Sequence, residues 1–192
     1  AWGDGTRVGV FPMSDDTVYY YLLKVTPQGR PAPVWPALRE EFTAYLGHGV
    51  CGDLVASLPD TPPFHHDLLE LSRHEWGVPR AILLGDAAHA MTPNVGQGAA
   101  MAIEDALVLA RVLDDGVDGA LLRYRTLRAP RVREIASRAR QFGQMALMRG
   151  RLATGARAAM FRATPQRYYD ESWRTMIGGG VDLVGSLGSS GS

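Results

Sequence analysis

The sequence predicts a mixed α/β (α+β) fold, and three observations point to it. Two runs rich in β-branched and aromatic residues flank a polar turn near the N-terminus. A short apolar run in mid-chain ends in a glycine and an aspartate, and long stretches with apolar residues at helical spacing follow it. The 192 residues are 46% hydrophobic and 21% charged, which suits one or two globular domains with a core and excludes global disorder.

The N-terminal part is expected to begin with a β-hairpin. Residues 7–13 and 17–23 have high β propensity, and the polar turn Ser14-Asp15-Asp16 separates them. Apolar residues then recur at helical spacing over 37–47, which predicts a short amphipathic helix.

A glycine-rich run follows that helix, at Gly47-His48-Gly49-Val50-Cys51-Gly52, and has the spacing G-x-G-x-x-G of a dinucleotide-binding motif. That motif binds a pyrophosphate where a strand turns into a helix, and here a predicted helix comes first. We therefore expect no nucleotide site at this run.

The middle of the chain is expected to hold a strand, a turn and a helix. The apolar run Ala81-Ile82-Leu83-Leu84 predicts a short buried strand of the parallel type, which ends at Gly85-Asp86. Residues 98–113 carry apolar residues on two stripes, which predicts a helix buried on both sides. Its acidic residues, Glu104 and Asp105, lie in the early turns, where the helix dipole favours negative charge.

The last third of the chain is expected to be helical and to end in a flexible tail. Residues 120–148 carry an apolar stripe opposite a row of arginines, and Pro130 should kink or divide this helix. Helical structure is expected to continue over 150–176. Three consecutive glycines and a Gly/Ser-rich end predict a flexible tail over 177–192.

Charge is distributed unevenly along the chain. Residues 1–120 hold 16 acidic and 7 basic side chains, a net charge of −9, whereas residues 121–192 hold 4 acidic and 13 basic ones, a net charge of +9. Platforms for single-stranded nucleic acid need aromatic residues between the basic ones, and residues 123–157 contain only Tyr124 and Phe142. We therefore expect a solvated helix, or one that faces another part of the protein, and no nucleic-acid partner.

Several classes of protein are disfavoured by what the sequence lacks. A single cysteine, Cys51, argues against a disulfide framework and favours a reducing compartment such as the cytoplasm. His65 and His66 are adjacent and have no carboxylate or cysteine pattern to complete a ligand set, so we expect no metal. No apolar run approaches the roughly 20 residues that span a bilayer, so no membrane contact is expected. The first residues lack an initiator methionine and a signal-peptide pattern, which predicts that the chain begins within a longer protein.

The densest motif lies between residues 85 and 106. Asp86 follows Gly85 at the end of the predicted strand, where a ligand can approach the backbone closely and a carboxylate can accept hydrogen bonds from sugar-like hydroxyls. Gly96 and Gly98 precede the predicted helix, whose free N–H groups and positive dipole end favour the anionic edge of a ligand. The alternative is a plain strand, loop and helix connection in which the glycines only serve the turns.

This motif resembles the second FAD-binding motif of the class A flavoprotein monooxygenases, the aromatic-ring hydroxylase family. Members read Gly-Asp-Ala-Ala-His, a short loop with Pro, Gly-Gln-Gly, then Ala-Ile-Glu-Asp-Ala and a helix rich in alanine and leucine, and every element is present at 85–106. Many members have Asn where this chain has Ala100, a departure that affects one contact with the flavin edge. Looser matches extend the resemblance over residues 1–145, at the hairpin, Trp76, Arg80, Tyr124 and 128–131.

The resemblance implies that the chain is the carboxyl-terminal half of an FAD-binding, Rossmann-like monooxygenase. Its four parts would be a portion of a substrate-binding sheet domain (1–74), the carboxyl-terminal part of the FAD-binding domain (75–118), a C-terminal helical region (119–176) and the flexible tail (177–192). The family's amino-terminal half carries a strand–GxGxxG–helix unit and a mid-chain Asp-Gly motif, and this sequence has neither. The missing half is therefore an expected partner.

The same resemblance implies the site residues. Asp86 would bind the ribityl chain of FAD, and the backbone amides of residues 96–100 would face the pyrimidine edge of the flavin, where negative charge develops on reduction. Pro93 would border the space between flavin and substrate and is the one catalytic position implied. His89 is expected to be structural. The full set expected to bind FAD is Gly85, Asp86, Pro93, Gly96, Gln97, Gly98, Ala99 and Ala100.

The implied activity is FAD-dependent hydroxylation. NADPH or NADH would reduce FAD, O2 would form a flavin C4a-hydroperoxide, and one oxygen atom would pass to a small aromatic substrate. That substrate would contact the hairpin, with Phe11, Tyr19 or Tyr21 on one face and Tyr20 on the other, although cross-strand packing is an alternative role for these side chains.

Two other functions stay open at this point. One is another flavoenzyme of the same superfamily, such as an epoxidase, a halogenase or a reductase. The other is a non-catalytic fragment that binds a partner through its arginine-rich helix. A homodimer is compatible with each of these functions.

Overall fold

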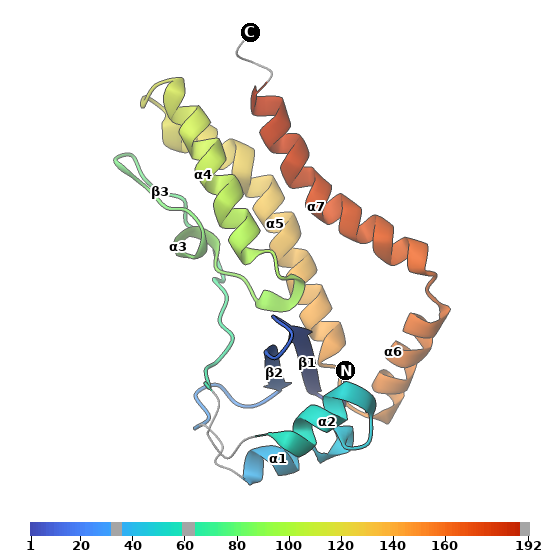
Figure 1. The fold of residues 1–192 in the computed structure, drawn as a ribbon. Helices are drawn as coiled ribbons and strands as arrows, with labels where there is room; N and C mark the ends of the chain where they lie inside the picture. The colour runs from blue at the N-terminus through green and yellow to red at the C-terminus, as the bar shows by residue number, and fades with distance from the viewer. Residues whose placement is uncertain (32–35, 59–63, 189–192) are drawn as a thin grey trace. The chain divides into compact units, whose positions relative to one another are not determined.

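The computed structural model describes residues 1–31, 36–58 and 64–188 (Figure 1). It has the mixed helix and strand composition that the sequence predicts. The elements in chain order are β1 Thr6–Pro12, β2 Val18–Lys24, α1 Ala37–Glu41, the 3-10 helix η1 Thr43–Tyr45, α2 Gly49–Ser57, β3 Gly77–Val78, β4 Ala81–Ile82, α3 Asp86–His89, the 3-10 helix η2 Pro93–Val95, α4 Gly98–Asp114, α5 Ala120–Ala146, α6 Arg151–Ala163 and α7 Gln166–Gly188.

The chain divides into two compact units. The first contains Ala1–Asp67 and Gln144–Phe161, and the second contains Leu68–Gly143 and Arg162–Ser192. The first boundary lies at residue 67, where the sequence predicts 74. The predicted C-terminal helical region is shared between both units.

The first unit is built on the predicted hairpin, which is confirmed. β1 and β2 pair antiparallel, from Thr6 opposite Lys24 to Pro12 opposite Val18. Because side chains alternate along a strand, one face of the hairpin points into an apolar core that α1, η1 and α2 complete. The buried residues of this core are Val8, Leu38, Phe42, Tyr45, Val55 and Leu58.

The helix predicted over 37–47 is present as two pieces, α1 and η1. The backbone leaves helical geometry at Phe42, with φ −117° and ψ 12°. This break lets both Phe42 and Tyr45 enter the core, where their ring centroids lie 6.1 Å apart.

The run at 47–52 opens α2, a helix that the sequence analysis did not predict. The element before it is η1 and not a strand, so the surroundings of a dinucleotide motif do not occur there. Gly52 has a packing role, because a Cβ on it would overlap the carbonyl oxygen of Tyr45.

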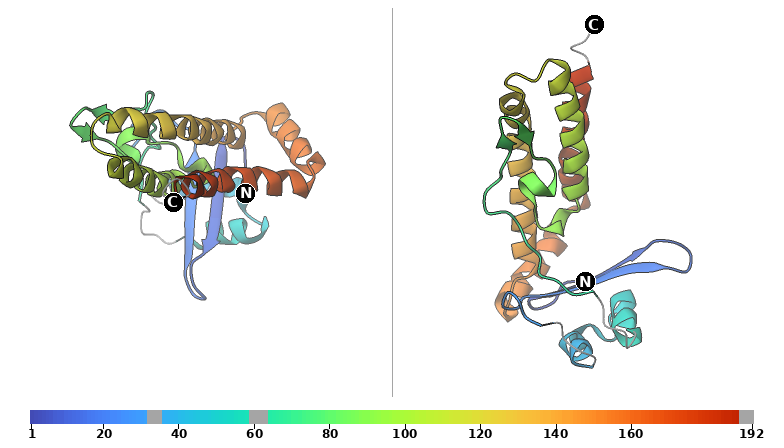
Figure 2. Two further views of the ribbon diagram at one scale, coloured as in Figure 1. Left: turned by 90° about the horizontal axis from the view of Figure 1, so that it is seen from above. Right: turned by 90° about the vertical axis from the view of Figure 1, so that its left-hand side faces the viewer.

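In the second unit, α4, α5 and α7 lie side by side around an apolar core (Figure 2). α5 continues as one helix through Pro130, which therefore does not divide it. The buried side chains of Ala129 and Val132 on either side hold the helix to the core despite the lost backbone hydrogen bond. No helix in the described ranges is both long enough and apolar enough to cross a membrane.

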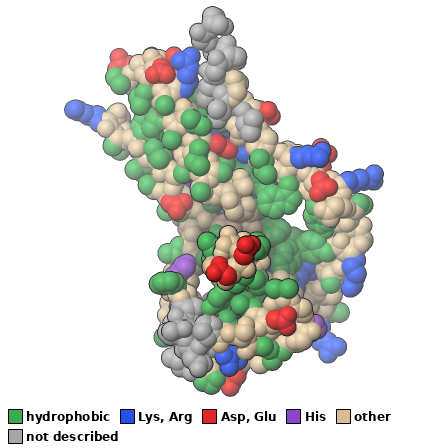
Figure 3. Space-filling model, viewed as in Figure 1, with side chains coloured by type: hydrophobic (Ala, Val, Ile, Leu, Met, Phe, Trp, Pro, Cys, Tyr) green, Lys and Arg blue, Asp and Glu red, His purple; other side chains and the backbone are tan. Residues whose placement is uncertain are grey.

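α4 confirms the helix predicted over 98–113, but the prediction that both sides are buried is wrong. Ile103 is 64% and Leu107 48% exposed, and Figure 3 shows hydrophobic side chains on the surface where α4 lies. The helix turns its carboxylates inward because they pair there with arginines of α5, and such pairs attract more strongly inside a protein than in water. The buried residues of α4 are Met101, Glu104, Asp105, Val108 and Val112.

The apolar run at 81–84 does not form the buried parallel strand that the sequence predicts. β4 pairs antiparallel with β3, with Gly77 opposite Ile82 and Val78 opposite Ala81. These two strands form a sheet of their own within the described residues. A parallel strand needs a neighbour from a long crossover connection, and the part of the chain described here offers β4 only a tight hairpin partner.

The flexible tail predicted over 177–192 is wrong for residues 177–188, which belong to α7, and residues 189–192 lie outside the described residues. Two of the glycines there, Gly179 and Gly180, serve close packing. A Cβ on Gly180 would overlap Oε1 of Glu104, and a Cβ on Gly179 would lie 3.0 Å from Nη1 of Arg131. Because glycine has no side chain, the backbone of α7 can approach α4 and α5 closely.

Candidate functional site

The turn after β4 is held by hydrogen bonds on both sides of Gly85. The Gly85 N–H donates to Oδ2 of Asp105 at 2.8 Å, and the Gly85 carbonyl accepts from the amides of Ala88 at 3.0 Å and His89 at 2.9 Å. Gly85 has φ +57° and ψ −141°, a conformation open to glycine almost alone, and a Cβ on it would lie 3.1 Å from the Cβ of Ala102. The backbone of this turn therefore requires glycine.

Asp86 follows on this turn as the first residue of α3, and it is exposed to solvent. A carboxylate offers several acceptor positions, which suits a ligand with neighbouring hydroxyl groups. The turn thus presents an accessible carboxylate on a backbone that is held in place.

The N-terminus of α4 supplies the second feature of the site. Gly96, with φ +63°, ends η2, and the first backbone bond of α4 runs from the Met101 amide to the Gln97 carbonyl. The amides of residues 98–100 precede that bond and have no acceptor within the helix. A Cβ on Gly96 or Gly98 would meet nothing within 4 Å, so the space beside these glycines is open. The positive end of this 17-residue helix therefore favours the anionic edge of a ligand.

The eight residues expected to bind FAD lie along one continuous stretch, from the end of β4 to the first turn of α4, within the second unit. Asp86, Pro93, Gly96 and Ala99 are exposed, whereas Gly85 is buried as a support of the turn. Pro93 begins η2. The open glycines and the accessible carboxylate fit the ribityl chain and the pyrimidine edge of FAD.

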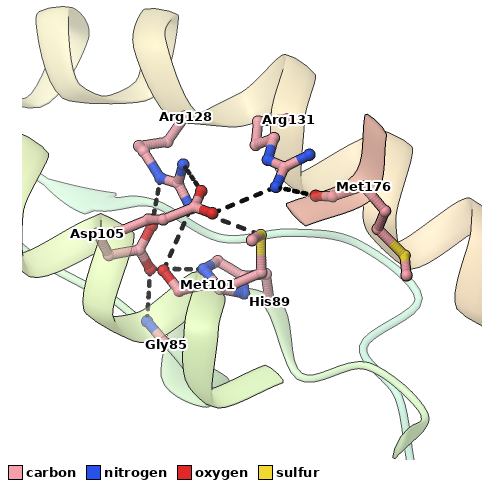
Figure 4. A network of polar contacts seen from close by, with 8 residues as sticks. Gly85, His89, Met101, Asp105, Arg128, Arg131 and Met176 are labelled. Carbon is pink, nitrogen blue, oxygen red and sulfur yellow. Dashed lines mark hydrogen bonds and ion pairs between the residues drawn. The ribbon is translucent and has the colours of Figure 1, made fainter. Parts of the chain in front are cut away.

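A buried ionic network, which the sequence analysis did not predict, supports this connection (Figure 4). Arg128 of α5 donates from Nε to Oδ1 of Asp105 at 2.7 Å and from Nη1 to Oε2 of Glu104 at 2.6 Å. Arg131 donates to the Met176 carbonyl at 2.6 Å and pairs with Oε1 of Glu104 at 3.3 Å. The network therefore joins α4, α5 and α7.

The carboxylate of Asp105 is ionised at the centre of this network. Burial acts to raise the pKa of Asp105, but hydrogen bonds from His89, Gly85 and Arg128 outweigh it and hold the pKa below its ordinary value. An ionised carboxylate only accepts, so Nε2 of His89, which lies 2.6 Å from Oδ2 of Asp105, must carry a hydrogen. His89 is buried within the network, which agrees with a structural role.

A signal for this network is present in the sequence. Glu104 and Asp105 are adjacent on one helix, and Arg128 and Arg131 are three residues apart on the next. The acidic residues were expected to serve the helix dipole, and the arginine-rich helix was expected to be solvated or to face another part of the protein, so the pairing of Glu104 and Asp105 with these arginines was not predicted. The error arose because neither helix alone reveals which of its faces meets the other.

Other arginines of the basic region also make internal contacts. Arg123 donates to the Val112 carbonyl at 3.2 Å, and Arg140 donates to Oε1 of Glu70 at 2.9 Å. Together with Arg128 and Arg131, these side chains stabilise the second unit. The alternative of a partner-binding arginine surface is correspondingly weaker.

The face of the hairpin away from its apolar core carries aromatic side chains. The rings of Phe11, Tyr19 and Tyr21 have centroids 6.0 to 6.3 Å apart. The Arg7 guanidinium lies 5.2 Å from the centre of the Tyr21 ring, within range of a cation–π interaction. Tyr20 packs against the core on the opposite face, so the predicted division of these side chains between two faces is confirmed.

Metal ligands do not gather anywhere in the described part of the chain. No group of three or more His, Cys, Asp or Glu side chains there is arranged to hold a metal ion. His65 and His66 are both exposed.

Comparison with known proteins gives one family model and several relatives that are longer than this chain. A family model described as FAD binding domain matches residues 5–139. The chain is 32% identical over 167 residues to the aurachin C monooxygenase/isomerase of Stigmatella aurantiaca, a match that covers 84% of this chain and 43% of that protein. It is 38% identical over 146 residues to the FAD-dependent urate hydroxylase of Mycolicibacterium vanbaalenii, a match that covers 72% of this chain and 36% of that protein. It is 43% identical over 117 residues to the 2-heptyl-3-hydroxy-4(1H)-quinolone synthase of Pseudomonas aeruginosa, a match that covers 58% of this chain and 30% of that protein.

The chain spans less than half the length of these relatives. Among solved structures, that of Klebsiella pneumoniae HpxO complexed with FAD and uric acid matches with a TM-score of 0.73 and 24% identity. The match covers 92% of this chain and 46% of that one. This likeness shows a shared fold.

Proposed function

Because this chain belongs to the FAD binding domain family, we propose that it forms the ribityl- and pyrimidine-binding part of the flavin site in an FAD-dependent monooxygenase. The geometry of the connection from β4 to α4 carries the proposal. It presents an exposed Asp86 on a hydrogen-bonded turn and then the open N-terminus of a 17-residue helix. The first feature suits hydroxyl groups and the second an anionic edge, and FAD has both.

Each predicted residue then has a role that its position supports. Asp86 would accept hydrogen bonds from the ribityl hydroxyls, and the amides of residues 97–100 would donate to the pyrimidine edge. The Gly96 amide, which was also expected to face this edge, already donates to the Pro93 carbonyl at 3.1 Å. The dipole of α4 would favour the negative charge that this edge gains on reduction. Ala100 has no side-chain amide, so the backbone alone would make these contacts. When bound, FAD supplies the redox chemistry, in which NAD(P)H reduces the flavin and the reduced flavin reacts with O2.

We propose a small planar aromatic or heteroaromatic ring as the substrate that receives one oxygen atom. Relatives include a urate hydroxylase and a quinolone synthase. The open face of the hairpin suits such a ring, because Phe11, Tyr19 and Tyr21 offer flat apolar surfaces and Arg7 a positive charge. Pro93, which begins η2 in the second unit, would form an apolar border of the flavin site on its substrate side. An epoxidase, halogenase or reductase would use the same flavin contacts, so substrate tests must separate these activities.

The proposal includes a contribution from residues outside these 192. Relatives are more than twice as long as the part matched here, and we propose that an amino-terminal half binds the ADP part of FAD. The protein would act in the cytoplasm, where NAD(P)H is available, and a homodimer is compatible with this function.

Titration of the chain with FAD, followed by flavin fluorescence and absorbance, tests the proposal. The Asp86→Ala variant should bind FAD about tenfold or more weakly, since hydrogen bonds to a charged group are worth about 1.5–3 kcal/mol. Asp53→Ala, which removes an exposed aspartate of α2 in the first unit, is the matched control and should bind like the wild type. Equal affinity of all three proteins would contradict the assignment of Asp86.

Turnover identifies the reaction. Consumption of NAD(P)H and O2 that aromatic compounds stimulate would support a hydroxylase. Dependence on chloride would instead indicate a halogenase.

A further inference from the structure

Asp105 links the two features of the proposed flavin site. It lies early in α4, whose N-terminus is one feature, and its Oδ2 accepts from the Gly85 amide at 2.8 Å (Figure 4). The same oxygen accepts from Nε2 of His89 at 2.6 Å. Gly85 directly precedes α3 and His89 is its last residue. One carboxylate oxygen therefore holds the turn Gly85–His89, which carries Asp86, at both ends.

The carboxylate is itself held in one orientation. Its second oxygen, Oδ1, accepts from Nε of Arg128 at 2.7 Å, and both residues are fully buried. Arg128 is fixed in turn by Glu104, and Arg131 adds a second positive charge. Two carboxylates thus face two guanidiniums, and rotation of Asp105 would break contacts on both of its oxygens.

We propose that Asp105 is a positioning residue of the flavin site, which acts on FAD through the turn Gly85–His89. This inference rests on the proposed function. Asp86 and the N-terminus of α4 would contact different parts of one ligand, so their separation must match the distance between those parts. Asp105 belongs to α4 and bonds to the turn, and it therefore sets that separation.

Glu104→Gln is the matched control for Asp105→Asn. Glu104 is the adjacent residue, is also buried and accepts from the same guanidinium of Arg128, but its hydrogen bonds lead to arginines and not to the turn. Both substitutions keep the size of the side chain and remove one negative charge. A difference between the two variants therefore reports the bonds to Gly85 and His89.

Amide hydrogen exchange tests the inference without a ligand. Asp105→Asn should speed exchange at Gly85, Ala88 and His89 about tenfold or more relative to Glu104→Gln, because local opening of a segment sets its exchange rate. Equal exchange at these amides in the two variants would overturn the inference.

A second pair of variants applies if Asp105→Asn fails to fold. Gln at position 89 can donate a hydrogen bond to Asp105, whereas Leu cannot. His89→Gln should therefore keep the turn protected, and His89→Leu should not. Equal protection in both would overturn the inference.

FAD binding to the same chain supplies the functional measurement. If Asp105 acts through the turn that carries Asp86, the combined loss of affinity in the double variant Asp105→Asn/Asp86→Ala should be smaller than the product of the two separate losses. In Glu104→Gln/Asp86→Ala, the combined loss of affinity should equal the product of the two separate losses. If the loss of affinity in Asp105→Asn/Asp86→Ala equals the product of the two separate losses, the inference is overturned. If the wild-type chain binds no FAD, the proposed function fails, and hydrogen exchange still decides whether Asp105 orders the turn.

Discussion

The carboxylate of Asp105 and the guanidinium of Arg128 lie 2.7 Å apart, and neither side chain is exposed to solvent. The two residues come from different helices, α4 and α5, and are 23 positions apart in the sequence. A buried charge that loses its partner is strongly destabilising, because it can be neither hydrated nor paired. The packing of α4 on α5 should therefore respond sharply to changes in this network.

Arg128→Met should lower the free energy of unfolding by about 3–5 kcal/mol, since it leaves two buried carboxylates without their shared partner. Urea denaturation followed by circular dichroism measures this change. Arg138→Met is the control, because Arg138 pairs with Glu134 on the surface of α5 and such pairs contribute about 0–1 kcal/mol. Equal losses in the two variants would contradict the importance of the network.

Asp105 should also make stability depend on pH in the acid range. Burial acts to raise its pKa, but the hydrogen bonds it accepts outweigh burial, so the pKa in the folded chain lies below its ordinary value. Folding therefore favours the ionised form. The resulting stabilisation is complete above the unfolded-state pKa of about 3.9 and is lost as the pH falls through the folded-state pKa.

Asp105→Asn lacks this stabilisation at every pH. The difference in unfolding free energy between wild type and Asp105→Asn should therefore shrink as the pH falls below about 4. Denaturant titrations across the acid range measure it. A constant difference over that range would show that Asp105 does not titrate with the expected sign.

The glycines of α7 give a test of its packing. Gly180→Ala should destabilise the chain by about 1–3 kcal/mol, because the added Cβ would overlap Oε1 of Glu104 and force the helices apart. Gly178→Ala is the control, since a Cβ there meets nothing within 4 Å and alanine is favoured over glycine in a helix by about 1 kcal/mol. The midpoint temperature of thermal unfolding should therefore fall in Gly180→Ala and rise in Gly178→Ala. A segment without fixed packing would give the same response to both.

Gly98 offers a test of the open space at the start of α4. A Cβ on Gly98 meets nothing within 4 Å, so Gly98→Ala should leave the stability of the free chain within about 1 kcal/mol of wild type. If the flavin edge occupies that space, the same substitution should weaken FAD binding about tenfold through the overlap it creates.

Gly155→Ala, on α6, adds a Cβ in equally open surroundings and should change FAD binding little. Calorimetry gives the stability of each variant, and FAD titration gives its affinity for FAD. Unchanged FAD affinity in Gly98→Ala would exclude close approach of the flavin at this helix end.

Local elements of the fold could be predicted because their causes lie within short segments. The hairpin has its own β propensity and turn residues, and 98–113 has its own helical spacing, so both are confirmed. The motif at 85–106 could be identified for a similar reason. Its glycines and its aspartate meet requirements of the local backbone, as the φ of +57° at Gly85 shows.

Errors occurred where a segment depends on a distant partner. The three glycines at 178–180 have the composition of a linker, yet they lie in a helix, and two of them, Gly179 and Gly180, let its backbone come close to Arg131 and Glu104. The run at 81–84 has the composition of a buried strand, yet it forms a short hairpin within the described residues. α2 was missed because glycines at 47 and 49 masked a helix that the core of the first unit stabilises.

The sequence by itself determined the class of fold, the hairpin, the long helices and the motif that relates this chain to its family. Only the tertiary structure decided that α4 turns Glu104 and Asp105 inward and leaves Ile103 exposed. The physical reason is that a charge can be buried only beside its counter-charge. The counter-charge of Asp105 is Arg128, on another helix, and only the folded chain brings the two together.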